Sequence, residues 1–249
     1  MSETMITLVT GANKGIGRQI AARLGALGHV VVIGARSAEL GRKAAAELRD
    51  GGADAASVVL DVTDPASVGA AATEIESRYG RLDALVNNAG ISRPPGSDLD
   101  DQRPSTADLD VLRAVFETNY FGVVAVTNAM LPLLRRSASP RIVNVSSSVG
   151  SLGIGADLVH ADGGPIPISA GYCPSKTALT ALTLQYAREL LPDGIKVNAV
   201  CPGYVATDLN GHRGHRTPAE GAVAAVRMAT VGADGPTGTF TDDEGPVRW

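Results

Sequence analysis

Tyr172 and Lys176 are four positions apart, at the start of a stretch (Pro174–Leu191) whose composition predicts a helix. Residues with this spacing lie one turn apart on one helical face. A phenol can donate a proton to a carbonyl oxygen that gains negative charge on reduction, but its usual pKa of about 10 is far from neutral. A neighbouring ammonium group lowers that pKa because it favours the phenolate. The pair therefore predicts a proton donor, although an exposed helical pair without function has the same spacing.

A glycine-rich loop, Thr10–Gly17, lies between a predicted strand, Met5–Val9, and a predicted helix, Arg18–Leu27. Its glycines permit a tight turn and a close approach to a pyrophosphate, while the helix N-terminus supplies free N–H groups and a partial positive charge. The spacing G-x-x-x-G-x-G differs from the common G-x-G-x-x-G dinucleotide pattern. Its position at the first strand–helix junction nevertheless favours nucleotide binding over a glycine turn without a ligand.

Arg36 follows the next predicted strand, Val30–Ile33, and lies 19 residues after Gly17. In dinucleotide-binding folds, an acid about 20 residues after the glycines binds the ribose 2′-hydroxyl. A guanidinium at this place instead suits a 2′-phosphate, which an acid would repel. The sequence therefore favours NADP(H) over NAD(H), and Lys14 is a second candidate for the same phosphate. The alternative for both residues is an ordinary surface cation.

Short β-branched runs alternate with alanine- and leucine-rich helical stretches along the chain. Continuous apolar strands separated by helices are typical of a parallel sheet that is covered on both faces. Without a repeat or a linker, residues 1–249 are predicted to form one α/β domain of the doubly wound Rossmann type. The other predicted elements are helices Ala38–Arg49 and Val68–Tyr79, two helical stretches within 107–135, and strands Val58–Leu60, Ala84–Asn87, Arg141–Val145 and Lys196–Val200.

Two irregular stretches, Gly150–Gly171 and Gly203–Thr217, interrupt this alternation. Long irregular segments in a compact domain are usually lids, binding loops or disordered segments. We interpret both as candidate substrate segments, with an unstructured surface loop as the alternative. Their small, apolar composition favours a medium-sized, weakly charged substrate. Arg213 and Arg216 are candidates to bind a carboxylate, but a solvated surface position is the favoured interpretation.

The composition excludes several other classes of protein. Apolar residues at 44% and charged residues at 19% indicate a globular chain. No apolar run approaches the ~18 residues that a membrane span needs. The 22 basic and 26 acidic side chains give a net charge of −4, which excludes broad nucleic-acid binding. No basic segment precedes the first apolar run, so we expect no secretory signal and a cytoplasmic location.

The histidines and cysteines do not suggest a metal or thiol site. His160, His212 and His215 lie in separate irregular segments, whereas metal ligands need facing geometry. Cys173 and Cys201 are too few for a disulfide scaffold, and neither has the adjacent base that a nucleophilic thiol needs. We therefore expect packed or partly exposed thiols and no metal.

Taken together, the motifs resemble those of the short-chain dehydrogenase/reductase family over nearly the whole chain. Each motif by itself is common, but the full set occurs in the family's order. More narrowly, the chain looks like the carbonyl-reductase-like branch, in part because Ser147 and Tyr172 are 25 residues apart, although carbonyl reductases carry a still longer insertion. The motifs that carry the family resemblance are Thr10–Gly17, Asn87–Gly90, Asn119, Ser147, Tyr172 with Lys176, and Pro202-Gly203. Those that carry the branch resemblance are Gly11–Gly17, Asn119–Gly122, Thr217–Ala222 and the ending Gly235–Trp249.

The resemblance implies an NADPH-dependent reductase of ketones or aldehydes that also runs as an alcohol dehydrogenase. It implies that Tyr172 donates the proton and Ser147 a hydrogen bond. It also implies that Lys176 holds the nicotinamide ribose and that Asn119 positions a water on the lysine. Several pKa units of lowering are needed at the phenol, so the lysine and the positive nicotinamide ring would act together. The implied cofactor contacts are Gly11, Asn13, Lys14, Gly15, Ile16, Gly17, Arg36, Asp61, Val62, Asn88, Ala89, Gly90, Tyr172, Lys176, Pro202, Gly203, Val205 and Thr207.

Alternatives stay open at several of these positions. Ser146, Ser147 and Ser148 are consecutive, and only the family motif favours the middle one. Asn119 also suits a capping or interior role, and Asp61 a turn. For the whole chain, the alternatives are a non-catalytic NADP-binding regulator on the same fold and an epimerase or dehydratase. The latter needs a longer substrate domain than 249 residues allow.

The oligomeric state also stays open. Members of the family often pair through the helices near 107–135 and 174–191, but longer insertions block that face. The sequence therefore leaves both a monomer and a homo-oligomer as expectations, with a small-molecule substrate as the partner and neither nucleic acid nor membrane.

Overall fold

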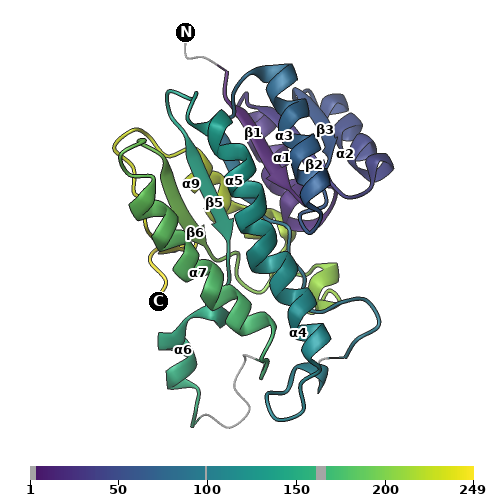
Figure 1. Ribbon diagram of the computed structural model, residues 1–249, viewed down its shortest axis with the longest axis vertical. Coiled ribbons are helices and arrows are strands. Elements are labelled where there is room, and N and C mark those ends of the chain that lie inside the picture. Colours follow the sequence, from purple (N-terminus) through teal and green to yellow (C-terminus); the bar gives the residue numbers. More distant parts are fainter. Residues whose placement is uncertain (1–3, 99, 161–166) are drawn as a thin grey trace.

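The computed structural model describes residues 4–98, 100–160 and 167–249, and within them a seven-stranded parallel sheet has the order β3-β2-β1-β4-β5-β6-β7 (Figure 1). The order reverses direction between β1 and β4, as the doubly wound prediction requires. The strands are β1 (Ile6–Thr10), β2 (Val30–Ala35), β3 (Ala55–Val59), β4 (Ala84–Asn87), β5 (Arg141–Val145), β6 (Lys196–Val200) and β7 (Phe240–Thr241).

Helices cover both faces of this sheet, which confirms the predicted fold class. Neighbouring strand residues alternate between the two faces, as the period of two in a strand demands. Leu8 packs on the face covered by α3, α5 and α7, whereas Val9 packs on the face covered by α1, α2 and α9. The helices are α1 (Gly15–Ala26), α2 (Ala38–Asp50), α3 (Pro65–Tyr79), α4 (Leu109–Phe116), α5 (Gly122–Leu134), α6 (Leu152–Asp157), α7 (Tyr172–Glu189), α8 (Pro218–Gly221) and α9 (Val223–Ala229).

The C-terminal region contains elements that the sequence pattern did not predict. β7 has two residues and α8 has four, so both are too short to show a period. Their structure comes from contacts: β7 pairs with Ala199 and Val200 of β6, and α9 packs its alanines on the sheet. β3 also begins earlier than the predicted Val58.

The segment Gly150–Gly171 was expected to be irregular, and this is wrong for its first part. Ser147 begins a 3₁₀ turn, Ser148–Gly150, and Ser151 caps α6 by accepting a hydrogen bond of 3.0 Å from the Ile154 amide. The glycines in α6 hid the helix because glycine is a weak helix former. Residues 161–166 of this segment lie outside the described residues.

The parts that carry the candidate chemistry gather at one edge of the sheet. In Figure 1, α6 and the start of α4 extend beyond the sheet at the end toward which the β5 arrow points. This is the carboxyl edge, where ligands bind in open α/β sheets. No helix in the described ranges is long and apolar enough to cross a membrane.

Candidate active site

Helix α7 positions Tyr172 and Lys176 on adjoining turns, because it begins at Tyr172, two residues earlier than the predicted start. The Lys176 side chain is buried, and its Nζ donates a hydrogen bond of 2.8 Å to the Val145 carbonyl at the end of β5. The same Nζ lies 5.8 Å from the centroid of the Tyr172 ring. Gly150 lets the chain pass this close to α7, since a Cβ there would lie 2.7 Å from the Lys176 carbonyl carbon.

The electrostatics of the pair differ from the sequence expectation. Burial raises the pKa of the Tyr172 phenol far above its usual value, while a hydrogen bond with Ser147 opposes this shift. Burial lowers the pKa of the Lys176 ammonium from 10.5 to about 8, and Cys201 opposes that shift. Lowering of the phenol pKa by Lys176 is therefore not seen among the protein's own groups.

The structure distinguishes the first two of the three consecutive serines that follow β5. Ser146 is buried, and its Oγ makes hydrogen bonds of 2.8 Å with Thr180 Oγ1 and 3.2 Å with the Lys176 carbonyl. Ser147 is only partly buried; its Oγ accepts a weak 3.4 Å hydrogen bond from the Val149 amide and lies near the phenol. This geometry favours Ser147 over Ser146 as the donor to a substrate oxygen.

Asn119 lies in a π-helical turn, Glu117–Phe121, between α4 and α5. Its Oδ1 accepts a hydrogen bond of 2.9 Å from the Ile91 amide, and its Nδ2 donates to the Ile91 carbonyl (2.9 Å) and to Ser175 Oγ (3.0 Å). The amide is thus used to join the segment after β4 to α7. Turns of the π type inside helices occur frequently at functional sites. Sequence reasoning missed Ser175, whose Oγ also donates to the Tyr172 carbonyl at 2.7 Å.

The residues Asn88 and Ala89 are brought directly onto the glycine loop. Thr10 Oγ1 accepts hydrogen bonds from the Asn88 amide (3.0 Å) and the Ala89 amide (2.9 Å). Asn88 Nδ2 donates to the Thr10 carbonyl at 2.9 Å. A Cβ at Gly90 would lie 3.2 Å from Asn119 Oδ1 and 3.5 Å from Lys176 Nζ. The predicted cofactor segment after β4 therefore adjoins both the glycine loop and the catalytic candidates.

The first turn of α1 fits an anion. Within the described residues, no side chain caps this helix: its N-cap is Lys14, which makes no capping hydrogen bond. Free N–H groups and the helix dipole suit a phosphate at such an end. A Cβ at Gly17 would clash with Asn88 and lie 2.8 Å from the Gly11 carbonyl, so a larger residue would displace the loop. Gly15 and Ile16 are the first two residues of α1, and Gly11 and Asn13 lie in the turn that precedes it.

Lys14 makes an ion pair with Asp208 at 2.6 Å, which joins the glycine loop to the segment after β6. This hydrogen bond from Lys14 is the main cause that lowers the pKa of the Asp208 carboxyl. His212 Nε2 lies 2.8 Å from the other oxygen of Asp208. The Lys14 ammonium is thus already paired with the Asp208 carboxylate.

Arg36 and Asp61 lie at the ends of neighbouring strands. Arg36 is exposed directly after β2. Asp61 Oδ1 accepts hydrogen bonds from the Thr63 amide (3.0 Å) and Thr63 Oγ1 (2.7 Å). The carboxylate thus stabilises a local turn, which was the alternative to adenine binding for Asp61. Burial acts to raise the pKa of Asp61, but the Thr63 hydrogen bonds and the Arg36 charge outweigh it, and the net pKa is lowered. Val62, next along the chain, packs against Gly122, where a Cβ would lie 2.9 Å from its carbonyl.

The segment 203–217, hereafter the β6–α8 loop, begins at a turn that depends on Cys201. The buried Cys201 Sγ accepts hydrogen bonds from the Ser148 amide (3.2 Å) and the Gly203 amide (3.4 Å). It therefore ties the Ser147 turn to the Pro202-Gly203 turn, a role that sequence reasoning missed. Thr207 reaches the glycine loop, since a Cβ at Gly15 would lie 3.6 Å from its Cγ2. Val205 is buried and forms a β-bridge with Arg216.

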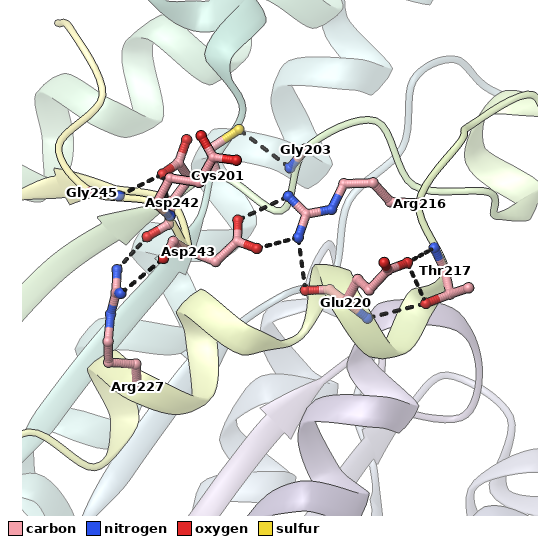
Figure 2. A network of polar contacts seen from close by, with 10 residues as sticks. Cys201, Gly203, Arg216, Thr217, Glu220, Arg227, Asp242, Asp243 and Gly245 are labelled. Atoms are coloured by element: carbon pink, nitrogen blue, oxygen red, sulfur yellow. Dashed lines mark hydrogen bonds and ion pairs between the residues drawn. The ribbon is translucent and has the colours of Figure 1, made fainter.

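The expectation that Arg216 is solvated is wrong. Figure 2 shows its guanidinium facing the Asp243 carboxylate, with a hydrogen bond of 2.8 Å from Nη1 to Oδ1 and a second from Nη2 to Oδ2. Nη2 also donates to the Glu220 carbonyl at 3.3 Å. Arg216 thus anchors the β6–α8 loop to the C-terminal segment. Its partner Asp243 lies 27 residues away in sequence, which is why sequence spacing did not reveal the pair.

The remaining titratable candidates make local contacts. His215 packs on Tyr204, with ring centroids 6.0 Å apart. Cys173 is partly buried, and burial raises the pKa of its thiol to about 11, which keeps it protonated near neutral pH. In the described ranges, no group of three or more His, Cys, Asp or Glu side chains could hold a metal ion.

Comparison with known proteins agrees with this arrangement. A model of the short chain dehydrogenase family matches residues 5–217. The chain belongs to the short-chain dehydrogenase/reductase family. As a short-chain dehydrogenase/reductase, it is an oxidoreductase that binds a nicotinamide cofactor and acts on CH–OH or C=O groups.

Several members of the short-chain dehydrogenase/reductase family align with nearly the whole chain. Salutaridine reductase of Papaver bracteatum is 34% identical, over 94% of this chain and 93% of that protein. (-)-Isopiperitenone reductase of Mentha piperita is 35% identical, over 94% of each. The solved structure of salutaridine reductase from Papaver somniferum matches with a TM-score of 0.80 at 31% identity, over 96% of this chain and 99% of that chain.

Proposed function

We propose that this protein is an NADPH-dependent carbonyl reductase that transfers hydride to a ketone or aldehyde and runs in reverse as an alcohol dehydrogenase. One observation carries the proposal. Tyr172 and Lys176 lie on adjoining turns of α7 beside the partly buried Ser147, at the carboxyl edge of the sheet. A proton donor, a cation and a hydrogen-bond donor are the groups that a carbonyl oxygen needs as it gains charge.

Each side chain has a separate task in this mechanism. The bound nicotinamide cofactor supplies the hydride and, in its oxidised form, a positive charge. Ser147 donates a hydrogen bond to the substrate oxygen, and Tyr172 delivers the proton. Lys176, fixed by Val145, adds positive charge beside the phenol and holds the cofactor ribose. The Asn119 side chain holds Ile91 and Ser175 in place next to this group, and by the family resemblance Asn119 positions a water on Lys176 for proton relay.

The proposed cofactor contacts divide into three groups. The uncapped start of α1 with its glycines suits the pyrophosphate. Asn88, Ala89, Gly90, Asp61 and Val62 suit the adenosine, and the turn from Pro202 to Thr207 suits the nicotinamide amide. Arg36 is exposed at the end of β2, where a 2′-phosphate would meet it, and supports NADP(H) over NAD(H).

The proposed substrate is a medium-sized, weakly charged carbonyl compound. Large apolar side chains are exposed on the segments at the carboxyl edge: Leu152 is 70% exposed and Tyr204 49%. Of the two arginines in the β6–α8 loop, Arg216 is held by Asp243, so its charge is already paired within the protein. The relatives named salutaridine reductase, (+)-neomenthol dehydrogenase and (-)-isopiperitenone reductase support a small-molecule carbonyl or alcohol substrate.

A panel of cyclic and aromatic ketones and aldehydes, assayed with NADPH and NADH side by side, tests the function. We expect NADPH oxidation with at least one apolar ketone, and alcohol product in equal amount. A purified protein that binds NADPH but oxidises it with none of the panel would support the non-catalytic regulator instead.

Replacing Arg36 with alanine is expected to raise the KM for NADPH by about 10- to 100-fold, because a charged hydrogen bond to phosphate contributes roughly 1.5–3 kcal/mol. The KM for NADH should stay within about twofold. Arg23→Ala, an exposed arginine near the other end of α1, is the matched control. Comparable efficiency with both cofactors in the unmodified protein would refute the role given to Arg36.

A further inference from the structure

Gln102 has a fully buried polar side chain next to the start of α7, the helix that carries Tyr172 and Lys176. It lies in the segment between β4 and α4. Its Oε1 accepts hydrogen bonds from the Tyr172 amide (2.9 Å) and from Ser169 Oγ (2.8 Å). Its backbone carbonyl accepts another from the Ala170 amide at 2.7 Å. Gln102 therefore contacts three residues of the short stretch that leads into α7.

This contact replaces a missing helix cap. Gly171, the N-cap of α7, has no side chain to cap the helix. The cap comes instead from Gln102, 70 residues away, and from Ser169, whose Oγ accepts from the Tyr172 amide at 2.8 Å. A Cβ at Gly171 would lie 2.5 Å from Gln102 Oε1, so the glycine makes room for this contact. The peptide of Tyr172 is thus fixed from outside its own helix.

The other end of the Gln102 side chain reaches the segment after β4. Nε2 donates a hydrogen bond of 2.8 Å to the Ser92 carbonyl. Ser92 Oγ in turn donates to the Leu209 carbonyl of the β6–α8 loop at 2.8 Å. Asp208, next to Leu209, pairs with Lys14 of the glycine loop. Polar contacts, linked through the backbone of Ser92 and of Asp208-Leu209, therefore join the Tyr172 peptide to the glycine loop.

We propose that Gln102 is a positioning residue for Tyr172: it fixes the first peptide of α7 and couples it through Ser92 to the β6–α8 loop. The reason is geometric. Tyr172 is the first residue of α7, where a helix frays most readily, yet proton transfer requires the phenol to hold its place against Ser147 and the substrate. This inference rests on the proposed reductase function.

Gln102→Met tests the role because methionine has nearly the same length but makes no comparable hydrogen bonds. We expect kcat to fall about 10- to 100-fold, since a displacement of about 1 Å can cost that much. The NADPH Kd should stay within twofold. The pH at which kcat declines should rise by at least half a unit, because the Ser147 hydrogen bond that lowers the phenol pKa is loosened. Amide hydrogen exchange at Tyr172 should accelerate at least tenfold.

Two further variants separate positioning from folding. Gln102→Glu keeps the acceptor for the Tyr172 amide, but its carboxylate form has no proton to donate to Ser92. At a pH where this carboxyl is ionised, exchange at Tyr172 should stay slow while kcat falls three- to tenfold. Gln185→Met, on the exposed side of α7, is the matched control and should match the unmodified enzyme in every measurement. If Gln102→Met does not fold, Gln102→Glu decides: an unchanged kcat in it overturns the proposal.

Exchange at Tyr172 is measured without turnover, which keeps the two claims apart. An unmodified enzyme that reduces no carbonyl refutes the proposed function and with it this role. A folded Gln102→Met variant overturns the positioning role if its kcat, or its amide hydrogen exchange at Tyr172, stays within twofold of the unmodified enzyme. The proposed function would still stand.

Discussion

Tyr172→Phe is expected to lower kcat for carbonyl reduction by about 10²–10⁴-fold, the usual contribution of a general acid. The substitution removes one oxygen from a partly buried ring at the start of α7 and leaves the packing of the ring intact. NADPH binding, followed by the fluorescence of the reduced nicotinamide, should therefore change by no more than about twofold. Steady-state kinetics on the best ketone of the panel give the comparison.

Tyr79→Phe in α3 is the matched control, because it removes the same oxygen from a partly buried tyrosine on a different helix. It should keep the full kcat. A Tyr172→Phe enzyme that retains more than a tenth of the kcat would show that the proton comes from another group. Ser147 and solvent water would then be the candidates.

Lys176→Met is expected to affect activity and stability in opposite directions. Activity should fall at least 100-fold, because the cation beside Tyr172 and the proposed contact to the cofactor ribose are both lost. The folded protein, however, should become more stable at pH 7. Burial lowers the pKa of Lys176 from 10.5 to about 8, and that difference corresponds to about 3 kcal/mol against the charged form. Loss of the hydrogen bond to Val145 costs roughly 1.5–3 kcal/mol and offsets part of this stabilisation. The free energy of unfolding should therefore rise by a net of about 1 kcal/mol.

The pH dependence of this gain identifies its cause. The pKa of Lys176 is lower in the folded than in the unfolded chain, so between about pH 8 and pH 10.5 the unfolded chain holds more protons at this group. The buried charge therefore destabilises the fold by its full amount below about pH 8, and this destabilisation disappears as the pH rises to about 10.5. Denaturant titrations of both proteins at pH 7, 8, 9 and 10 should show the advantage of the variant shrinking over this window.

Lys43→Met, at an exposed position of α2, is the control for loss of a lysine charge and should show no such pH-dependent difference. A constant difference in stability from pH 7 to pH 10 would contradict the burial of a charged Lys176. Unchanged activity in Lys176→Met would remove the cation from the proposed mechanism.

Sequence spacing predicted those parts of the site that one local element holds. Tyr172 and Lys176 share a face because the helical repeat puts residues four apart on adjoining turns. The glycine loop lies at a strand–helix junction that the sequence pattern already showed. The parallel α/β class followed from apolar strands between helices, and the structure confirms it.

The structure of α9 and the roles of Cys201 and Gln102 depend on contacts between distant segments, which sequence spacing did not predict. α9 is seven residues long, too short for a period to emerge, and is stabilised by the sheet beneath it. Cys201 is occupied by two backbone amides from different turns, which no thiol motif describes. A lone glutamine in a loop carries no signal for capping a helix 70 residues later.

The amino-acid order by itself determined the strand–helix alternation, the glycine loop and the Tyr172–Lys176 spacing, because each depends on backbone periodicity within a few residues. Tertiary structure decided which serine stays available, that Arg216 is held by Asp243, and that burial moves the pKa of the phenol upward and that of the ammonium downward. Those outcomes depend on which groups displace water around a side chain, and these groups come from segments far apart in the chain.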